Sequence, residues 1–199
     1  MAEKITLSKA DRMAVCFRST FLQGSWNYER MQNGGFAFAM MPAIKKLYTD
    51  KTERIAALKR HMEFFNTHPY IASPIIGVTL ALEQERANGA AVDDAAIQGV
   101  KVGMMGPLAG IGDSLIVGTL IPILLGIGLG LSSGGNPMGA IFYISSWKVL
   151  MWFGMRYAFD KGYSLGGRAV EILVGEQAQA VRDSILMVGT VVIGAVAAS

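Results

Sequence analysis

The sequence predicts an all-α, polytopic integral membrane protein, and three observations support this prediction. Hydrophobic residues make up 52% of the 199-residue chain and charged residues only 17%, whereas soluble domains carry about 25% charged residues. One long apolar run ends at Leu131, a second extends from Met138 to Phe159, and a third begins at Ser184. The 24 glycines favour Gly-rich transmembrane helices, because small residues let helix backbones approach each other closely.

The N-terminal part predicts two amphipathic helices. Residues 8–22 form the first, with Ser8 and Asp11 at the spacing of a capping box. It suits either the membrane surface or a docking position against the rest of the protein. Asp50 is placed to cap the second helix, which segment 66–69 ends. The apolar seam of this second helix consists of Ile55, Leu58, Met62 and Phe65.

Two further apolar segments are too short to cross a bilayer, which takes about 20 residues. The first follows a polar stretch within residues 23–49 and is expected to be a core, re-entrant or interfacial segment. The second, residues 70–82, is expected to be a re-entrant or cavity-lining helix. Asn88 and Gly89 then form a helix stop, and Asp93 begins the next helix.

The segment from Lys101 to Leu115 is the most unusual in the chain. It opens a long apolar run, yet it holds a carboxylate, Asp113. Gly and Pro free backbone groups that lipid cannot satisfy, so we expect a broken helix that faces protein or a wet cavity. Both features indicate a transport site. The predicted hinge residues are Gly106, Pro107, Gly110 and Gly112. Small-xxx-small spacing favours close helix packing for Gly99, Gly103, Gly106, Gly126 and Gly130.

Charge is distributed unevenly, although the net charge is only +3. Eleven of the 18 Lys and Arg residues precede His61, and the turn at residues 132–137 has no charge. The positive-inside rule therefore predicts a cytoplasmic N-terminus and an outside turn. We divide the single domain, 1–199, into cytoplasmic or interfacial helices (1–66) and a membrane-embedded region (67–199). The basic residues do not form the stripe expected of a nucleic-acid-binding surface.

Catalytic and metal-binding interpretations have little support. Residues 112–115 match the four-letter signature of one esterase class, but a serine nucleophile needs a histidine base. The two histidines, His61 and His68, both lie upstream, unlike the C-terminal histidine of those esterases. Their spacing does not suit a metal site, and a surface or capping role is favoured over a phosphocarrier role. We predict no catalytic residue, no metal and no cofactor.

A polar stretch near the N-terminus has the residue types of a sugar site. Amides and carboxylates exchange hydrogen bonds with hydroxyls, and an aromatic face covers the C–H side of a sugar ring. The candidates are Trp26, Asn27, Glu29, Gln32 and Asn33. The alternative is a polar loop packed on the next subunit. Asp113 either accepts hydrogen bonds from a polar substrate or caps a helix that restarts at Ser114.

Two of these segments together carry a family resemblance. Residues 26–36 (WNYERMQNGGF) and 103–114 (GMMGPLAGIGDS) resemble the IID subunit of the mannose/fructose/sorbose family of phosphotransferase-system (PTS) sugar transporters. Both motifs are long and unusual in composition, and the similarity extends over the whole chain. Members usually continue for several dozen residues beyond this point, so we expect the C-terminus to be truncated.

The resemblance implies a non-enzymatic, multi-pass subunit of the bacterial cytoplasmic membrane. A IID subunit pairs with a IIC subunit to form the path of a hexose of the mannose, glucose or fructose type, in a trimer of such pairs surrounded by lipid. IIA and IIB phosphoproteins relay phosphate from phosphoenolpyruvate through HPr, and the sugar emerges as its 6-phosphate. The phosphorylated histidines belong to IIA and IIB. Members also resemble bacteriocin receptors.

Within this interpretation, the expected substrate contacts are Trp26, Asn27, Glu29, Asn33 and Asp113. The basic residues expected to face the phosphoprotein are Arg30, Lys45 and Lys46. Two alternatives stay open: a structural IID subunit without sugar contacts, and an ion-coupled secondary transporter. The second alternative calls for another intramembrane acid near Asp113, which the long apolar runs do not contain.

Overall fold

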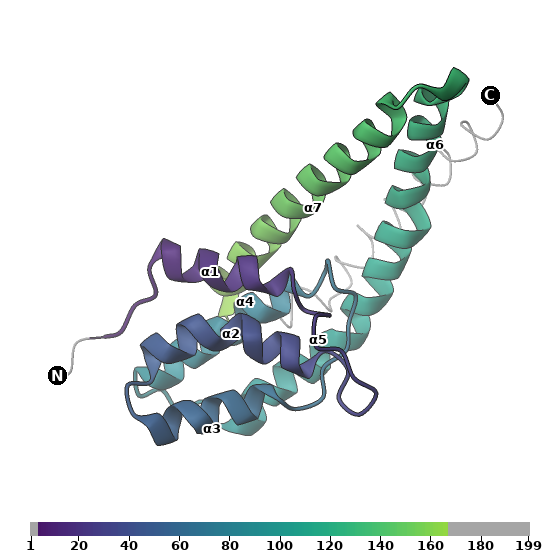
Figure 1. Ribbon diagram of the computed structural model, residues 1–199. Coiled ribbons are helices and arrows are strands. Elements are labelled where there is room, and N and C mark those ends of the chain that lie inside the picture. The colour runs from purple at the N-terminus through teal and green to yellow at the C-terminus, as the bar shows by residue number, and fades with distance from the viewer. Residues whose placement is uncertain (1–3, 167–199) are drawn as a thin grey trace.

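The computed structural model describes residues 4–166, and every regular element in that range is a helix (Figure 1). The α-helices are α1 (Lys9–Ser19), α2 (Asn33–Leu47), α3 (Lys51–His61), α4 (Ser73–Ala87), α5 (Asp94–Gly112), α6 (Ile121–Leu131) and α7 (Met138–Leu165). A π-helical segment, η1 (Asp113–Leu120), and a 3₁₀ turn, η2 (Ser133–Gly135), complete the order. The predicted all-α class is confirmed for this range, and the third apolar run, from Ser184, lies outside the described residues.

Helices α1 to α4 form a compact body from which a long hairpin of α6 and α7 projects (Figure 1). Helix α5 runs along the body and leads through η1 into α6, and η2 forms the tip of the hairpin. Helix α7 then returns to the body, where it packs mainly against α4. By length and composition, the continuous helix Asp94–Leu131 qualifies as a membrane-crossing helix among the described residues.

Helix α4 is the central element of the body. Its residues from Ser73 to Glu83 are all buried, because isoleucine, valine and leucine on every side of the helix require cover on every side. Pro74 lies in the first turn, where its missing N–H costs nothing. The helix ends at Asn88 and Gly89, as predicted, with Gly89 at a φ of +88°. Of the segment 70–82, which was expected to be re-entrant or to line a cavity, Tyr70 lines one, whereas residues Ser73–Leu82 are buried against their neighbours.

Close packing by glycine occurs where α4 meets α7. A Cβ atom on Gly77 would lie 2.3 Å from the Phe159 carbonyl oxygen, and one on Gly162 would lie 2.3 Å from that of Pro74. The predicted packing glycines behave differently: within the described part of the chain, an added Cβ would meet nothing within 4 Å at Gly99, Gly103, Gly106 or Gly130. The packing predicted for these four is therefore not made inside this part of the chain.

The capping box predicted for the first amphipathic helix is confirmed. For the second helix, the predicted start is confirmed but the predicted end is not. The Ser8 hydroxyl accepts from the Asp11 amide at 3.2 Å, and the Asp11 carboxylate accepts from the Ser8 amide at 2.7 Å. Asp50 caps α3, but this helix ends at His61, well before segment 66–69.

The predicted apolar seam of this segment is confirmed only in part, since Phe65 is buried in the core and Leu58 packs against it. Ile55 and Met62 are 45% and 39% exposed, whereas Ala57, Arg60 and His61 are buried. Arg60 and His61 face inward because Glu83 of α4 provides a buried partner for both.

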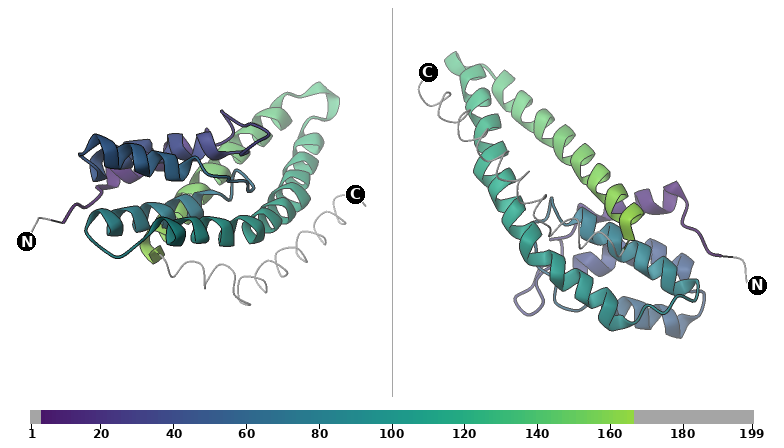
Figure 2. Two further views of the ribbon diagram at one scale, coloured as in Figure 1. Left: turned by 90° about the horizontal axis from the view of Figure 1, so that it is seen from below. Right: turned by 180° about the vertical axis from the view of Figure 1, so that it is seen from behind.

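The break predicted in the apolar helix is absent at Gly106 and Pro107. Helix α5 stays α-helical through Gly112, and Figure 2 shows α5, η1 and α6 as one curved helix. Proline removes a single N–H donor and bends a helix without ending it. The irregular hydrogen bonding comes later, in the π-helical segment η1. The helix does not restart at Ser114, so the capping role predicted for Asp113 is wrong.

Candidate functional site

The first motif folds into a tight loop before α2 that its own amides hold together. The Asn27 side chain donates to the Asn33 side-chain oxygen at 3.0 Å, and its oxygen accepts from the Arg30 amide at 2.8 Å. Asn33 in turn donates to the Met62 carbonyl at 2.8 Å. Met31 has a φ of +55°, a conformation uncommon outside glycine, which these bonds stabilise. The two predicted sugar-binding amides are thus engaged in fixing the loop.

Other predicted residues of this loop point outward. Trp26 is exposed and packs edge-on against Tyr28, with the ring centroids 4.8 Å apart. The exposed Glu29 carboxylate lies 3.2 Å from the Arg30 guanidinium. Glu29, Arg30 and the two amides line a shallow depression of about 370 Å³, and Asp113 is not among its lining residues. The structure therefore brings Asn27, Glu29 and Asn33 together, but Trp26, Gln32 and Asp113 do not line this depression.

The two motifs are linked by the segment between α3 and α4, residues 62–72, which we call the junction loop. Gln32 of the first motif donates to the Thr67 carbonyl at 2.7 Å and accepts from the Thr67 amide at 3.0 Å. The Thr67 hydroxyl donates to the carbonyl of Met105, in the second motif, at 2.9 Å. Gln32 and Thr67 are both buried. Gln32, a candidate sugar contact by sequence, therefore serves as a brace.

His68 of the junction loop packs directly onto the second motif. A Cβ atom on Gly112 would lie 2.4 Å from the His68 Cβ and Cγ atoms, so only glycine fits beneath this ring. Burial lowers the pKa of His68, and the nearby Asp113 carboxylate opposes this effect in part. Asp113 itself is exposed on the helix surface, at the start of η1. The sequence showed Thr67 only as part of a helix stop, and the roles considered for His68 did not include packing on Gly112, so the bracing role of both was missed.

A buried charge cluster lies deeper in the body, centred on Glu83 of α4. Its carboxylate accepts from Arg60 Nε at 2.8 Å and from the Tyr48 hydroxyl at 2.6 Å, and it lies 2.9 Å from His61 Nε2. Burial would raise the pKa of Glu83, but these partners outweigh it and lower the pKa to about 2. Arg60 also reaches Asp94 at the start of α5. The cluster thus joins α2, α3, α4 and α5.

The same cluster tests whether His61 could act as a phosphocarrier histidine. Burial lowers the pKa of His61, which is fully enclosed and packs against the ring of Phe36. An imidazole closed off in this way is inaccessible to a phosphoryl donor. Lys101 of α5 covers the same Phe36 ring, with its Nζ 4.7 Å from the ring centroid. Among residues 4–166, no group of three His, Cys, Asp or Glu side chains is arranged to hold a metal ion.

Comparisons with known proteins agree with the resemblance carried by the two motifs. Residues 6–199 match the family model described as PTS system mannose/fructose/sorbose family IID component. The PTS system mannose-specific EIID component of Escherichia coli K12 is 44% identical over 190 residues, which cover 95% of this chain and 67% of that protein. The fructose permease IID component of Bacillus subtilis 168 is 40% identical over 195 residues, covering 98% and 71%.

The fold is similar as well. A chain in the cryo-electron microscopy structure of the mannose transporter ManYZ with microcin E492 (MceA) superposes with a TM-score of 0.80 at 44% identity. The match covers 97% of this chain and 70% of that one. The chain therefore spans about two thirds of the length of the proteins it matches.

Proposed function

The chain belongs to the mannose/fructose/sorbose family of PTS IID components, and we propose that, together with a IIC subunit, it forms the path of a hexose through the bacterial cytoplasmic membrane. The relatives are named for mannose, sorbose and fructose at similar identities of 44%, 41% and 40%. These values favour no single sugar, so the proposal extends to hexoses of this type as a class.

One observation carries the proposal of direct sugar contact. Asp113 is an exposed carboxylate within the helix Asp94–Leu131, which qualifies as a membrane-crossing helix, and it lies where the helix becomes π-helical. A carboxylate at such a position needs a polar partner, and π-helical turns frequently mark functional sites. A sugar provides hydroxyl donors for both carboxylate oxygens. We assign this role to Asp113.

The N-terminal loop contributes a second set of contacts in this proposal. Trp26 and Glu29 are free to meet a sugar ring and its hydroxyls, whereas Asn27 and Asn33 hold the loop that presents them. The junction loop connects this loop to the second motif through Thr67. Movement of the long helix Asp94–Leu131 would therefore be transmitted to the N-terminal loop. The predicted hinge residues Gly110 and Gly112 lie in the stretch that leads into η1.

The remaining parts of the proposal concern partners and topology. The chain itself takes no phosphate. IIB phosphorylates the hexose during uptake with phosphate relayed through IIA, and the IIC–IID pairs assemble as a trimer. The N-terminus and its basic residues face the cytoplasm, as the positive-inside rule favours. The exposed apolar and glycine-rich face of α5 and α6 is available for IIC and lipid.

The test is Asp113→Asn in the assembled IIC–IID complex, with Glu53→Gln on the exposed side of α3 as the matched control. We expect hexose binding to fall about tenfold or more, since a charge-assisted hydrogen bond to a buried ligand contributes about 1.5–3 kcal/mol. Copurification of IIC should not change. Loss of IIC with intact hexose binding in the residual complex would support the structural alternative. Uptake driven by a proton gradient without phosphoenolpyruvate would refute the phosphotransferase function.

A further inference from the structure

A second cavity lies where α7 leaves the body, away from both motifs. It has a volume of about 480 Å³ and is lined by the end of α1 and the turn after it, by the junction loop and by α7. Its size falls within the range of about 300–1,000 Å³ that is typical of small-molecule sites. Nothing in the proposed sugar path uses it, because neither Asp113 nor the N-terminal loop residues line it.

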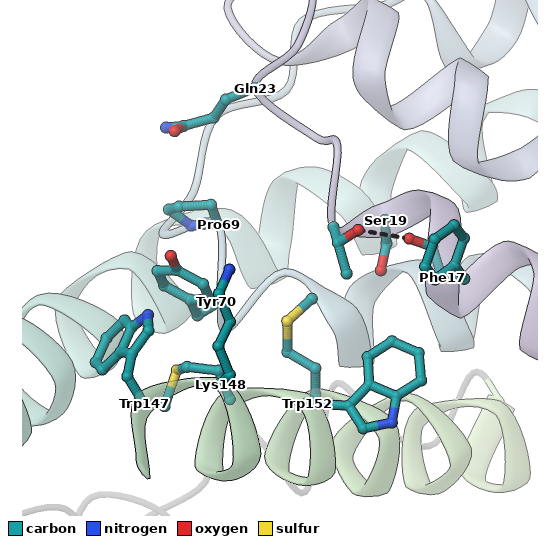
Figure 3. Close-up of a pocket in the computed structure, with 11 residues that line it drawn as sticks. Phe17, Ser19, Gln23, Pro69, Tyr70, Trp147, Lys148 and Trp152 are labelled. Carbon is teal, nitrogen blue, oxygen red and sulfur yellow. Dashed lines mark hydrogen bonds between the residues drawn. The ribbon is translucent and has the colours of Figure 1, made fainter. Parts of the chain in front are cut away.

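Two aromatic pairs form the ends of this cavity. Tyr70 and Trp147 pack edge-on with centroids 5.1 Å apart at one end, and Phe17 and Trp152 pack edge-on at 6.2 Å at the other. Figure 3 shows the two pairs on opposite sides, with the side chain of Lys148 rising from α7 beside Tyr70. The rings are held by each other, so the cavity has fixed walls.

The charge of the cavity selects the kind of ligand. Lys148 is the only charged residue among those lining it, and no carboxylate joins it there. Within residues 4–166, Lys148 also makes no ion pair, whereas Arg156 on the same helix pairs with Asp160 at 2.9 Å. A lysine flanked by Trp147 and by the apolar residues Val149 and Leu150 requires an anion or water at its head. Ser19, Thr20 and Gln23 add neutral polar groups to the lining, and the one full charge favours an anionic ligand over a neutral sugar.

The surroundings of the cavity are those of a membrane surface. Helix α1 is basic and amphipathic and exposes Phe17 at the cavity, and Phe21 in the turn after α1 packs against Phe17. On α7, the exposed apolar residues continue with Val149 and with Phe153, which is 67% exposed. Tryptophan, tyrosine and lysine gather where lipid headgroups lie, and basic amphipathic helices lie in the same layer. The exposed apolar surface of α7, which could contact acyl chains, therefore lies next to Lys148.

We propose that this cavity binds the headgroup of an anionic phospholipid. The phosphate accepts hydrogen bonds from Lys148 Nζ, the headgroup lies between the two aromatic pairs, and the acyl chains follow the exposed apolar face of α7. This site goes beyond the proposed sugar path. Through Tyr70, it places a lipid against the junction loop that braces both motifs.

The experiment measures which lipids the detergent-purified IIC–IID complex retains, by native mass spectrometry after incubation with equal amounts of phosphatidylglycerol and phosphatidylcholine. We expect Lys148→Met to lower the enrichment of phosphatidylglycerol about fivefold, as expected for removal of one lysine near an anionic headgroup. Lys161→Met is the control, because this exposed lysine of α7 lies over Tyr157, outside the cavity. Lys148→Arg should retain the enrichment.

Three results would overturn the proposal. The first is unchanged phosphatidylglycerol enrichment in Lys148→Met. The second is a loss of hexose binding in this variant while lipid retention is unaffected, which would make the cavity a sugar subsite. The third is complete displacement of phosphatidylglycerol by millimolar inorganic phosphate, which would indicate a plain anion site. If Lys148→Met fails to assemble, Lys148→Gln and Trp147→Leu provide the same comparison.

Discussion

Helix α4 and the long helix formed by α5, η1 and α6 both have long apolar stretches, yet their surroundings within residues 4–166 differ. Helix α4 is covered completely by its neighbours, and its glycine at position 77 touches the backbone of α7. The long helix leaves Gly103, Gly106 and Gly110 facing open space within the described residues. Apolar composition alone therefore does not distinguish a helix that is buried in the body from one whose apolar surface stays exposed within the described residues.

The polar residues of the two helices differ in the same way. Glu83 of α4 is enclosed and satisfied by Arg60 and Tyr48. Asp113 of the long helix is exposed at the start of a π-helical segment. Within residues 4–166, the covered helix finds its polar partners inside the chain, whereas the carboxylate of the long helix stays exposed, where we propose that it meets a sugar. The predictions below test this contrast.

The largest effect is expected from Glu83→Gln. Removing one member of a buried ion pair costs about 3–5 kcal/mol, and the buried Arg60 would keep only the largely exposed carboxylate of Asp94 as its partner. We expect the free energy of unfolding in detergent to fall by about 3 kcal/mol or more, measured by denaturant titration of the helical circular dichroism signal. Glu85→Gln, at an exposed position of the same helix, should change it by less than about 0.5 kcal/mol. Equal effects would contradict the role of the cluster.

The same carboxylate predicts an acid transition. The pKa of Glu83 is about 2 in the folded chain and 4.5 as the ordinary value. Because the unfolded chain binds the proton more readily, the stabilisation is complete above pH 4.5 and is lost as the pH falls towards 2. Unfolding free energies measured from pH 7 to pH 2 should therefore converge for the wild type and Glu83→Gln at the acid end. Curves that stay parallel down to pH 2 would contradict the lowered pKa.

A smaller effect is expected where α4 and α7 cross. Gly162→Ala forces a Cβ atom against the Pro74 carbonyl, and overpacking of this kind costs about 1–3 kcal/mol. Gly103→Ala places the same atom in open space, so the isolated chain should keep its stability or gain about 0.5–1 kcal/mol. The midpoint of thermal unfolding in detergent should therefore fall for Gly162→Ala and stay the same or rise for Gly103→Ala.

The pair of variants also tests the exposed face. If the open side of α5 meets IIC, Gly103→Ala should reduce copurification of IIC although the chain itself is stable. Unchanged copurification would indicate that this glycine faces lipid. Destabilisation of the isolated chain by Gly103→Ala would show that a part of the same chain covers it.

Local features of the fold were predictable from the sequence. Helix starts at Ser8, Asp50 and Asp93 and the stop at Asn88 and Gly89 depend on residues within one turn, so short patterns are sufficient to identify them. The all-α class and the membrane-crossing length of one helix follow from composition and run length in the same way.

Features that depend on distant partners were not predictable. The buried face of α3 was assigned only in part, because Arg60 and His61 are buried together with Glu83, a residue of another helix. Gln32 was a candidate sugar contact, whereas in the structure its side chain bonds the backbone of Thr67. The segment around Thr67 was predicted only to end a helix. The glycine contacts at positions 77 and 162 likewise require the crossing of two helices that lie far apart in the sequence.

The smallest effect on stability is expected from Thr67→Val, which tests the point where the covered body meets the exposed helix. The change keeps the volume of the side chain and removes the hydroxyl that donates to the Met105 carbonyl. A hydrogen bond of this kind contributes about 0.5–1.5 kcal/mol, and the chain should stay folded. Because this bond connects the two motifs, amide hydrogen exchange should increase in the loop around Asn27 as well as around Met105. Thr49→Val, at an exposed position between α2 and α3, is the control. Faster exchange confined to Met105 would show that the two motifs move independently, and the bracing role of the junction loop would then be wrong.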